Sequence, residues 1–157
     1  KFFENFKKTL FYSYFKAPYF KRTIKYVDTI LDSKHLYISE LAEYSIREFF
    51  NLIGIKKKFY TSSKELSLAN QLKGEERIIR ITKEMNCNVY INSINGSHLY
   101  KPENFKKNNI KLKFISPKIT QYRQSSKEFK PNLSIIDVLM YNSTPSIKEM
   151  IDSYIIE

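Results

Sequence analysis

Hydrophobic residues recur every three or four positions along the first third of the chain, which is the spacing of one helix face. The first such stripe lies in residues 1–15, and Pro18 interrupts it because proline disfavours helix in the residue before it. The two stripes on either side of the proline consist of Phe3, Phe6, Leu10 and Tyr14, and of Phe20, Ile24, Val27 and Leu31. We therefore predict two amphipathic helices, then a third with Ser39 as its N-cap and Gly54 at its C-terminal end.

Three β-prone runs alternate with helical segments in the middle of the chain. The runs lie at residues 58–61, 88–92 and 111–115, and the helical segments between them at residues 74–86 and 102–109. Alternation of this kind is typical of parallel sheets with crossover helices. We therefore predict an α/β fold with a three-layer, Rossmann-like parallel sheet and flanking helices. Residues 133–141 and a helix that starts at Pro145 complete it as a helical C-terminal tail.

The composition fits one folded domain over residues 1–157. Hydrophobic residues make up 42% of the chain and aromatic residues 15%, which is enough to build a core. No apolar run approaches the roughly 20 residues that a membrane-spanning helix needs. Cys87 is the only cysteine, as is common in a reducing cytoplasm, so we expect a cytoplasmic protein without a membrane span. Because the chain opens at Lys1 inside a predicted helix, we also expect it to be the C-terminal part of a longer protein.

The net charge of +11 raises the question of nucleic-acid binding. The basic excess is spread along the chain, and its one run is Lys56, Lys57 and Lys58. Lysine outnumbers arginine, although bidentate recognition of bases and phosphates favours arginine. We therefore predict no nucleic-acid partner. A basic surface can still attract a small substrate that carries phosphate.

A polar loop at residues 92–100 follows one predicted strand, and a pair of serines follows another. Open α/β sheets bind their ligands beyond the carboxyl ends of the strands, so both segments are expected at one crevice. The candidate substrate-binding residues are Ser62, Ser63, Asn92, Ser93, Gly96 and Tyr100. His98 lies in the same loop and is a candidate acid, base or phosphate contact, although an ordinary surface histidine has the same pattern.

Asp137 lies in a helical segment that is apolar on most sides. A carboxylate there has to be paired, hydrogen-bonded or facing a polar cleft, because a buried unpaired charge is costly. Asp137 is therefore either a catalytic group pointing into the crevice or a structural residue. Cys87 has no activating neighbour in the sequence, so we expect a buried, inert thiol. No glycine-rich phosphate loop and no cysteine or histidine pair at metal-ligand spacing occurs, and the sequence indicates no particular cofactor.

Several segments resemble the WbqC-like proteins, a family found in bacterial O-antigen and polysaccharide gene clusters. They keep the family's order and spacing over nearly the whole chain, and the last of them is the most specific. The segments are residues 16–20, 52–56, 74–78, 90–93 with Gly96, Leu99 and Tyr100, 110–114 and 131–142. Two features depart from the family. Its usual N-terminal strand–turn segment is absent, and Asn95-Gly96 stands where paired glycines are usual, so we expect Asn95 to preserve a left-handed turn.

The resemblance implies an enzyme of surface-polysaccharide synthesis that transfers glycine or a related acyl group to a nucleotide-linked amino sugar. Such a reaction needs hydrogen-bond donors, for which residues 92–98 are candidates, and a base, for which Asp137 and His98 are candidates. Two alternatives stay open: another modification of a nucleotide sugar, such as nucleotidyl transfer, and a non-catalytic binding or packing part of a larger synthesis protein. Assembly into a homo-oligomer also stays open.

Overall fold

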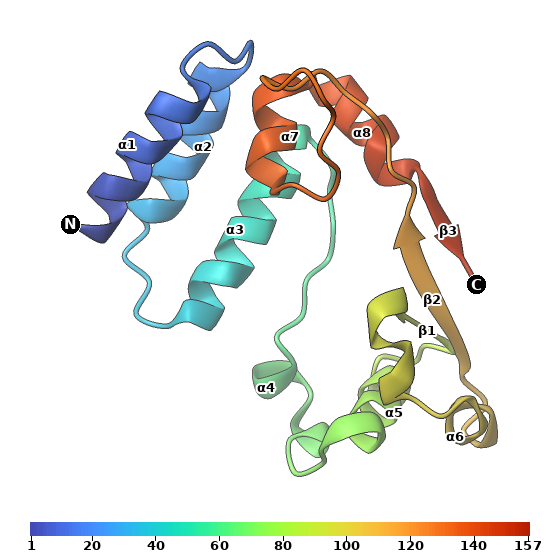
Figure 1. Ribbon diagram of the computed structural model, residues 1–157. Helices are drawn as coiled ribbons and strands as arrows, with labels where there is room; N and C mark the ends of the chain where they lie inside the picture. The colour runs from blue at the N-terminus through green and yellow to red at the C-terminus, as the bar shows by residue number, and fades with distance from the viewer. The chain divides into compact units, whose positions relative to one another are not determined.

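The computed structural model describes residues 1–157 apart from the side chain of Ser67, and its backbone contacts divide the chain into two compact units. Unit 1 comprises Lys1–Lys57 and Ile119–Asp152, and unit 2 comprises Lys58–Lys118 and Ser153–Glu157. Figure 1 shows the helices and strands of each unit. The sequence-based expectation of one domain, forming the C-terminal part of a longer protein, stays a prediction.

Unit 1 is helical. Its elements are α1 (Phe2–Tyr14), α2 (Phe20–Leu31), α3 (Ile38–Ile53), α7 (Ile135–Tyr141) and α8 (Thr144–Asp152). Helices α1 and α2 lie side by side in Figure 1, joined by the turn around Pro18. Their apolar stripes face a shared core that includes Leu10, Tyr26, Val27, Ile53, Leu139 and Ile147. The two predicted amphipathic helices at the start of the chain are thus confirmed.

The two ends of α3 test the predicted helix signals. Gly54 ends the helix with a left-handed φ of 68°, as predicted, and the following amide of Ile55 donates to the carbonyl of Phe50 at 3.0 Å. The predicted start at Ser39 is wrong. The helix begins earlier because the carbonyl of Tyr37 already accepts an intrahelical hydrogen bond from the amide of Leu41 at 3.1 Å.

Unit 2 combines a small sheet with short helices. Its elements are α4 (Ser62–Glu65), η1 (Ser67–Ala69), α5 (Gly74–Glu84), β1 (Val89–Ser93), η2 (Ile94–Leu99), α6 (Pro102–Lys107), β2 (Lys111–Pro117) and β3 (Tyr154–Ile156). The strand order is β1-β2-β3. Strands β1 and β2 are parallel, with Val89 opposite Lys111, and β3 is antiparallel to β2. Phe105 of α6 is fully buried and stacks on Tyr90 of β1, which fixes the helix on the sheet.

The α/β class is confirmed, and so are two of the three predicted strands, but the three-layer, Rossmann-like parallel arrangement is not: the described sheet has three strands, and β3 runs antiparallel to β2. The third predicted strand, residues 58–61, is wrong: this segment is irregular and leads directly into α4, where the carbonyl of Thr61 accepts the amides of Lys64 and Glu65. Its β propensity has no effect because a strand needs a neighbour to pair with. The described sheet instead gains β3, from the other end of the chain. No helix in the part of the chain that the structure describes is long and apolar enough to cross a membrane.

Candidate functional site

Asp137 lies in the first turn of α7, where Ser134 caps the helix by accepting the amide hydrogen of Ile136 at 3.3 Å. A carboxylate in the first turn interacts favourably with the helix dipole. The buried residues of α7 are Asp137, Leu139 and Met140, and Asp137 is only 5% exposed. The local sequence therefore brings one negative charge into the interior of unit 1, and the charge needs hydrogen-bond donors there.

Side chains from distant parts of unit 1 supply those donors. The phenol of Tyr14, at the end of α1, donates to Oδ2 of Asp137 at 3.0 Å. The phenol of Tyr122 donates to Oδ1 at 2.7 Å, and the amide of Gln124 approaches the same oxygen at 3.5 Å. Burial, followed by the hydrogen bond to Asp137, raises the pKa of both Tyr14 and Tyr122 to about 12, so both phenols stay protonated and donate at neutral pH.

A polar hollow of about 320 Å³ adjoins this buried carboxylate. It is lined by Tyr122, Arg123, Gln124, Ser125, Ser126, Lys127 and Phe129. Two of these residues, Tyr122 and Gln124, also donate hydrogen bonds to Asp137. The hollow is thus connected to the carboxylate by hydrogen bonds from its own lining.

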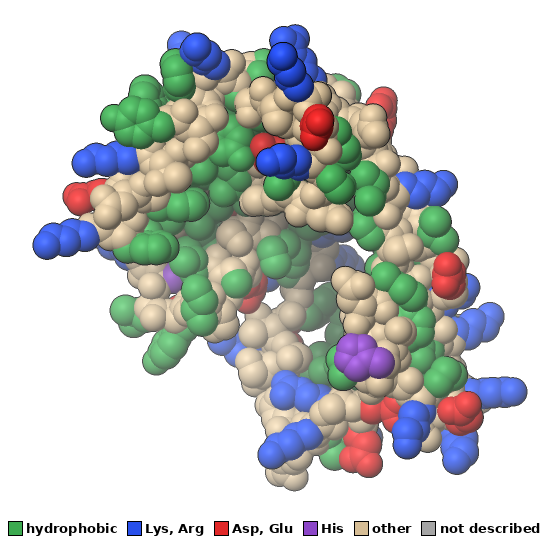
Figure 2. All heavy atoms as spheres, viewed as in Figure 1, with side chains coloured by type: hydrophobic (Ala, Val, Ile, Leu, Met, Phe, Trp, Pro, Cys, Tyr) green, Lys and Arg blue, Asp and Glu red, His purple; other side chains and the backbone are tan. Residues whose placement is uncertain are grey.

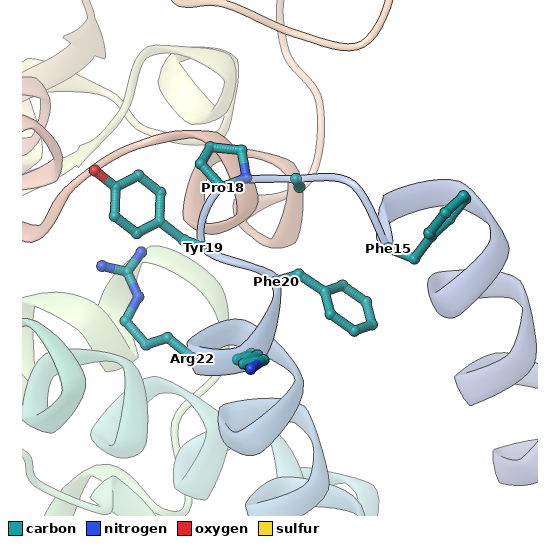
Figure 3. Close-up of a pocket in the computed structure, with 7 residues that line it drawn as sticks. Phe15, Pro18, Tyr19, Phe20 and Arg22 are labelled. Carbon is teal, nitrogen blue, oxygen red and sulfur yellow. The ribbon is translucent and has the colours of Figure 1, made fainter.

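A second hollow, of about 380 Å³, follows the turn between α1 and α2. Its lining runs from Phe15 to Arg22, and Figure 3 shows the guanidinium of Arg22 beside Tyr19, with the rings of Phe15 and Phe20 on the other side of the backbone. The guanidinium lies 4.6 Å from the Tyr19 ring centre and binds the carbonyls of Leu139 and Asn142 at 2.8 and 2.9 Å. Arg22 is therefore engaged at the C-terminal end of α7, and its burial lowers the pKa of the guanidinium.

In unit 2 the predicted loop forms a small hydrogen-bonded network. The amide of Asn92 donates to the phenol oxygen of Tyr100 at 3.1 Å, and its Oδ1 accepts the backbone amide of Ser93 at 2.8 Å. The structure therefore brings together three of the predicted substrate-binding residues. A Cβ added at Gly96 would lie 3.0 Å from Nδ2 of Asn92, so glycine provides room for that side chain.

The left-handed turn expected at Asn95 is wrong. Asn95 and Gly96 both lie within η2, and neither has a positive φ. A residue inside a 3₁₀ turn takes a right-handed conformation, so asparagine is accommodated there without using its tolerance for the left-handed one. Gly96 is required for space near Asn92 rather than for its backbone freedom.

The remaining predicted residues of unit 2 are more dispersed. Ser62 accepts a hydrogen bond from Arg77 at 3.2 Å, and the carbonyl of Ser63 accepts one from Asn70 at 3.1 Å. Since residues 58–61 form no strand, the reason for expecting these serines at a shared sheet edge is lost. His98 is exposed in η2. Cys87 is also exposed, so the expected buried thiol is wrong: the residue lies on the connection between α5 and β1, outside the core.

The predicted crevice combined Asp137 with the loop at residues 92–100. The structure assigns Asp137 to unit 1 and the loop to unit 2, and each has its own hydrogen-bonding partners. Sequence analysis missed the partners of Asp137. Tyr122 and Gln124 lie two positions apart, outside any helix or strand, and both reach Oδ1 of Asp137. The two-residue spacing is the sequence signal that could have indicated that Tyr122 and Gln124 act together.

Among the residues whose side chains are described, no three His, Cys, Asp or Glu side chains gather closely enough to hold a metal ion.

The comparison with known families covers nearly all of both units. The sequence model of the WbqC-like protein family matches residues 1–149. The chain belongs to the WbqC-like protein family. No curated protein and no solved structure matches it significantly. The part of this WbqC-like protein that matches includes Asp137, its three donors and the whole polar hollow, so the described site lies within the family region.

Proposed function

We propose that this WbqC-like protein is a transferase that moves a glycyl or related acyl group onto a nucleotide-linked amino sugar during synthesis of a bacterial surface polysaccharide such as O-antigen. Family membership supports the biological setting. The observation that carries the chemistry is the hydrogen bond between Tyr122, which lines the polar hollow, and the buried carboxylate of Asp137.

Acyl transfer to an amine requires a proton acceptor near the attacking nitrogen. In the proposed step, the nitrogen forms its bond to the acyl carbon and the leaving group departs with the electron pair of the broken bond. The proton from nitrogen passes to the phenol oxygen of Tyr122 while the phenol passes its own proton to Asp137. A direct hydrogen bond of 2.7 Å supports this path, because it lets the buried carboxylate act on a substrate that contacts only the phenol.

The loop of unit 2 is proposed by itself as a separate set of substrate-contacting groups, with its own hydrogen bonds. His98 is the second candidate acid–base residue, and its exposure leaves it accessible to a substrate. Asn92, Ser93, Gly96 and Tyr100 are proposed to bind substrate, supported by the network that orders the Asn92 side chain. The proposal leaves out Ser62 and Ser63, since the strand on which their selection depended is absent.

The test is an acyl-transfer assay with the whole chain, uridine diphosphate-linked amino sugars and activated glycyl or acetyl donors, read by mass spectrometry. We expect the unmodified protein to produce acylated sugar and Asp137→Asn to lose that activity. Asp152→Asn is the matched control, because Asp152 is an exposed acid of the same unit. His98→Gln tests the second acid–base residue. No product with any amino sugar would contradict the proposal, and full activity of Asp137→Asn would remove Asp137 from the mechanism.

A second candidate function is a non-catalytic binding or packing role in a larger synthesis protein. The observation that favours it is the set of exposed aromatic side chains on α1, which Figure 2 shows as a concentration of hydrophobic groups over that helix. Phe2 is 77% and Tyr12 is 76% exposed. Exposed apolar clusters mark interaction surfaces. Sedimentation would test this role: we expect concentration-dependent self-association that Phe2→Ser with Tyr12→Ser abolishes, whereas a strictly monomeric protein would contradict it.

A further inference from the structure

The loop that forms the polar hollow carries an excess of positive charge. Arg123 and Lys127 line the hollow, and both side chains are exposed. Among the described residues, no carboxylate lies within ion-pair distance of either side chain. Other cations of the chain, such as Lys7, Arg47 and Arg80, do form ion pairs. Ser125 and Ser126 line the same space, and the hydroxyl of Ser126 donates to the carbonyl of Glu128 at 2.5 Å. The hollow therefore combines two uncompensated cations with neutral hydrogen-bonding groups.

The same loop is held in one conformation by its own side chains. Gln124 donates from Nε2 to the carbonyl of Lys130 at 2.9 Å and accepts the amide hydrogen of Lys130 at 2.8 Å, which closes the loop like a pair of strand hydrogen bonds. The rings of Tyr122 and Phe129 pack edge to face at 5.5 Å. Tyr122 also anchors the loop to Asp137. The backbone that carries Arg123 and Lys127 is thereby constrained, which lowers the entropy cost of ordering the loop when a ligand binds.

We propose that this hollow is a diphosphate-binding subsite, in which Arg123 and Lys127 hold the two phosphates of a nucleotide-linked sugar. The inference rests on the proposed function and specifies which part of that substrate the hollow receives. The guanidinium of Arg123 suits bidentate contact with phosphate oxygens, and the ammonium of Lys127 supplies a second point charge. A volume of about 320 Å³ accommodates a diphosphate, which is smaller than a whole nucleotide sugar.

The nearby carboxylate does not oppose an anion in the hollow. Asp137 is 5% exposed, and its two oxygens accept hydrogen bonds from Tyr14 and Tyr122. These two hydrogen bonds partly compensate the negative charge of the carboxylate. The exposed acid of the loop, Glu128, is not among the residues that line the hollow. The lining itself therefore carries two positive charges and no negative one.

Calorimetric titration of the whole chain tests the subsite with inorganic phosphate, pyrophosphate and uridine diphosphate as separate probes. We expect pyrophosphate and uridine diphosphate to bind more tightly than phosphate, because they engage both cations. Arg123→Gln and Lys127→Gln should each weaken pyrophosphate binding about tenfold, as the loss of one charge-assisted hydrogen bond does. The matched control, Lys8→Gln with Lys25→Gln, removes two exposed lysines from α1 and α2 of the same unit and should leave binding unchanged.

Amide chemical shifts recorded during the pyrophosphate titration locate the ligand. We expect the shifts to concentrate in residues 122–130. An equal loss of affinity in the control, or shifts centred elsewhere, would overturn the subsite. The two proposals can fail separately. If the protein binds pyrophosphate in this loop but acylates no amino sugar, the subsite stands and the proposed reaction is contradicted. If the protein acylates the sugar and both Arg123→Gln and Lys127→Gln keep full activity, the proposed reaction stands and the subsite is contradicted.

Discussion

The phenol of Tyr122 donates a 2.7 Å hydrogen bond to Oδ1 of Asp137 and joins the loop before α7 to the first turn of that helix. Tyr14, which lies 123 residues before Asp137 in the chain, donates a hydrogen bond to the other carboxylate oxygen, Oδ2. The buried carboxylate therefore accepts hydrogen bonds from both chain segments of unit 1. Its hydrogen bonds compensate the cost of removing the charge from water.

Removing these hydrogen bonds should destabilise unit 1. Tyr122→Phe deletes one donor to a charged group and should lower the free energy of unfolding by roughly 1.5–3 kcal/mol. Asp137→Ala leaves two phenols without their acceptor and should cost roughly 2–4 kcal/mol. Urea unfolding measures both changes. Tyr12→Phe is the control, because Tyr12 is 76% exposed and a surface change of this kind should stay within about 0.5 kcal/mol. Equal effects of Tyr122→Phe and Tyr12→Phe would contradict the described network.

Alkaline pH should weaken the protein through the same tyrosines. The pKa of Tyr14 and of Tyr122 is raised from the ordinary value of 10.0 to about 12 in the folded protein. A raised pKa means that the folded state retains the proton more strongly, so this stabilisation is complete below pH 10 and is lost as the pH rises through 12. Unfolding experiments between these pH values should show a steep decline. The decline should be shallower in Tyr14→Phe with Tyr122→Phe, and an unchanged slope would contradict the assignment.

Arg22 should be needed to fix the C-terminal end of α7. One terminal nitrogen binds the carbonyls of Leu139 and Asn142, and the other binds the hydroxyl of Thr144 at 3.2 Å. Arg22→Ala should therefore lower the free energy of unfolding by roughly 2–4 kcal/mol. Arg22→Lys should recover only part of this loss, because an ammonium cannot reproduce the planar fork. Lys21→Ala, at an exposed neighbouring position, is the control in the same urea experiment and should have little effect.

Gly54 should be required for its backbone conformation rather than for space. Its φ is 68°, and an added Cβ would meet nothing closer than the Lys148 ammonium at 3.8 Å. Gly54→Ala should therefore cost about 1–2 kcal/mol in unfolding free energy, the penalty of a left-handed residue with a side chain. Gly54→Asn should cost less, because asparagine tolerates this region better. Equal losses for the two variants would indicate a steric cause instead.

Gly96 presents the opposite case, in which space matters and backbone freedom does not. In Gly96→Ala the new Cβ would lie 3.0 Å from Nδ2 of Asn92 and displace the amide that donates to Tyr100. We expect a loss of about 1 kcal/mol in stability, the value of one ordinary hydrogen bond. A double-mutant cycle with Asn92→Ala measures the coupling. Gly96→Ala should become nearly neutral once the Asn92 side chain is removed, and simple additivity would contradict the contact.

Local sequence signals predicted much of the fold. The apolar stripes of α1 and α2 predicted two helices, and alternation along residues 111–115 predicted β2. Gly54 predicted the end of α3. Each of these depends on residues close together in the chain. The failures depend on distant partners: residues 58–61 have strand propensity but no pairing, whereas β3 is a strand because β2 provides a neighbour for it.

The candidate site divides in the same way. The sequence by itself determined that Asp137 is an acid on an apolar helix and must therefore be paired, and that a polar segment begins at the carboxyl end of a strand, at Asn92. Only the tertiary structure decided that Tyr14 and Tyr122 pair with Asp137, and that Asp137 and the loop belong to different units. The physical reason is that burial cost depends on local hydrophobic pattern, whereas the identity of a hydrogen-bond partner depends on how distant segments of the folded chain meet.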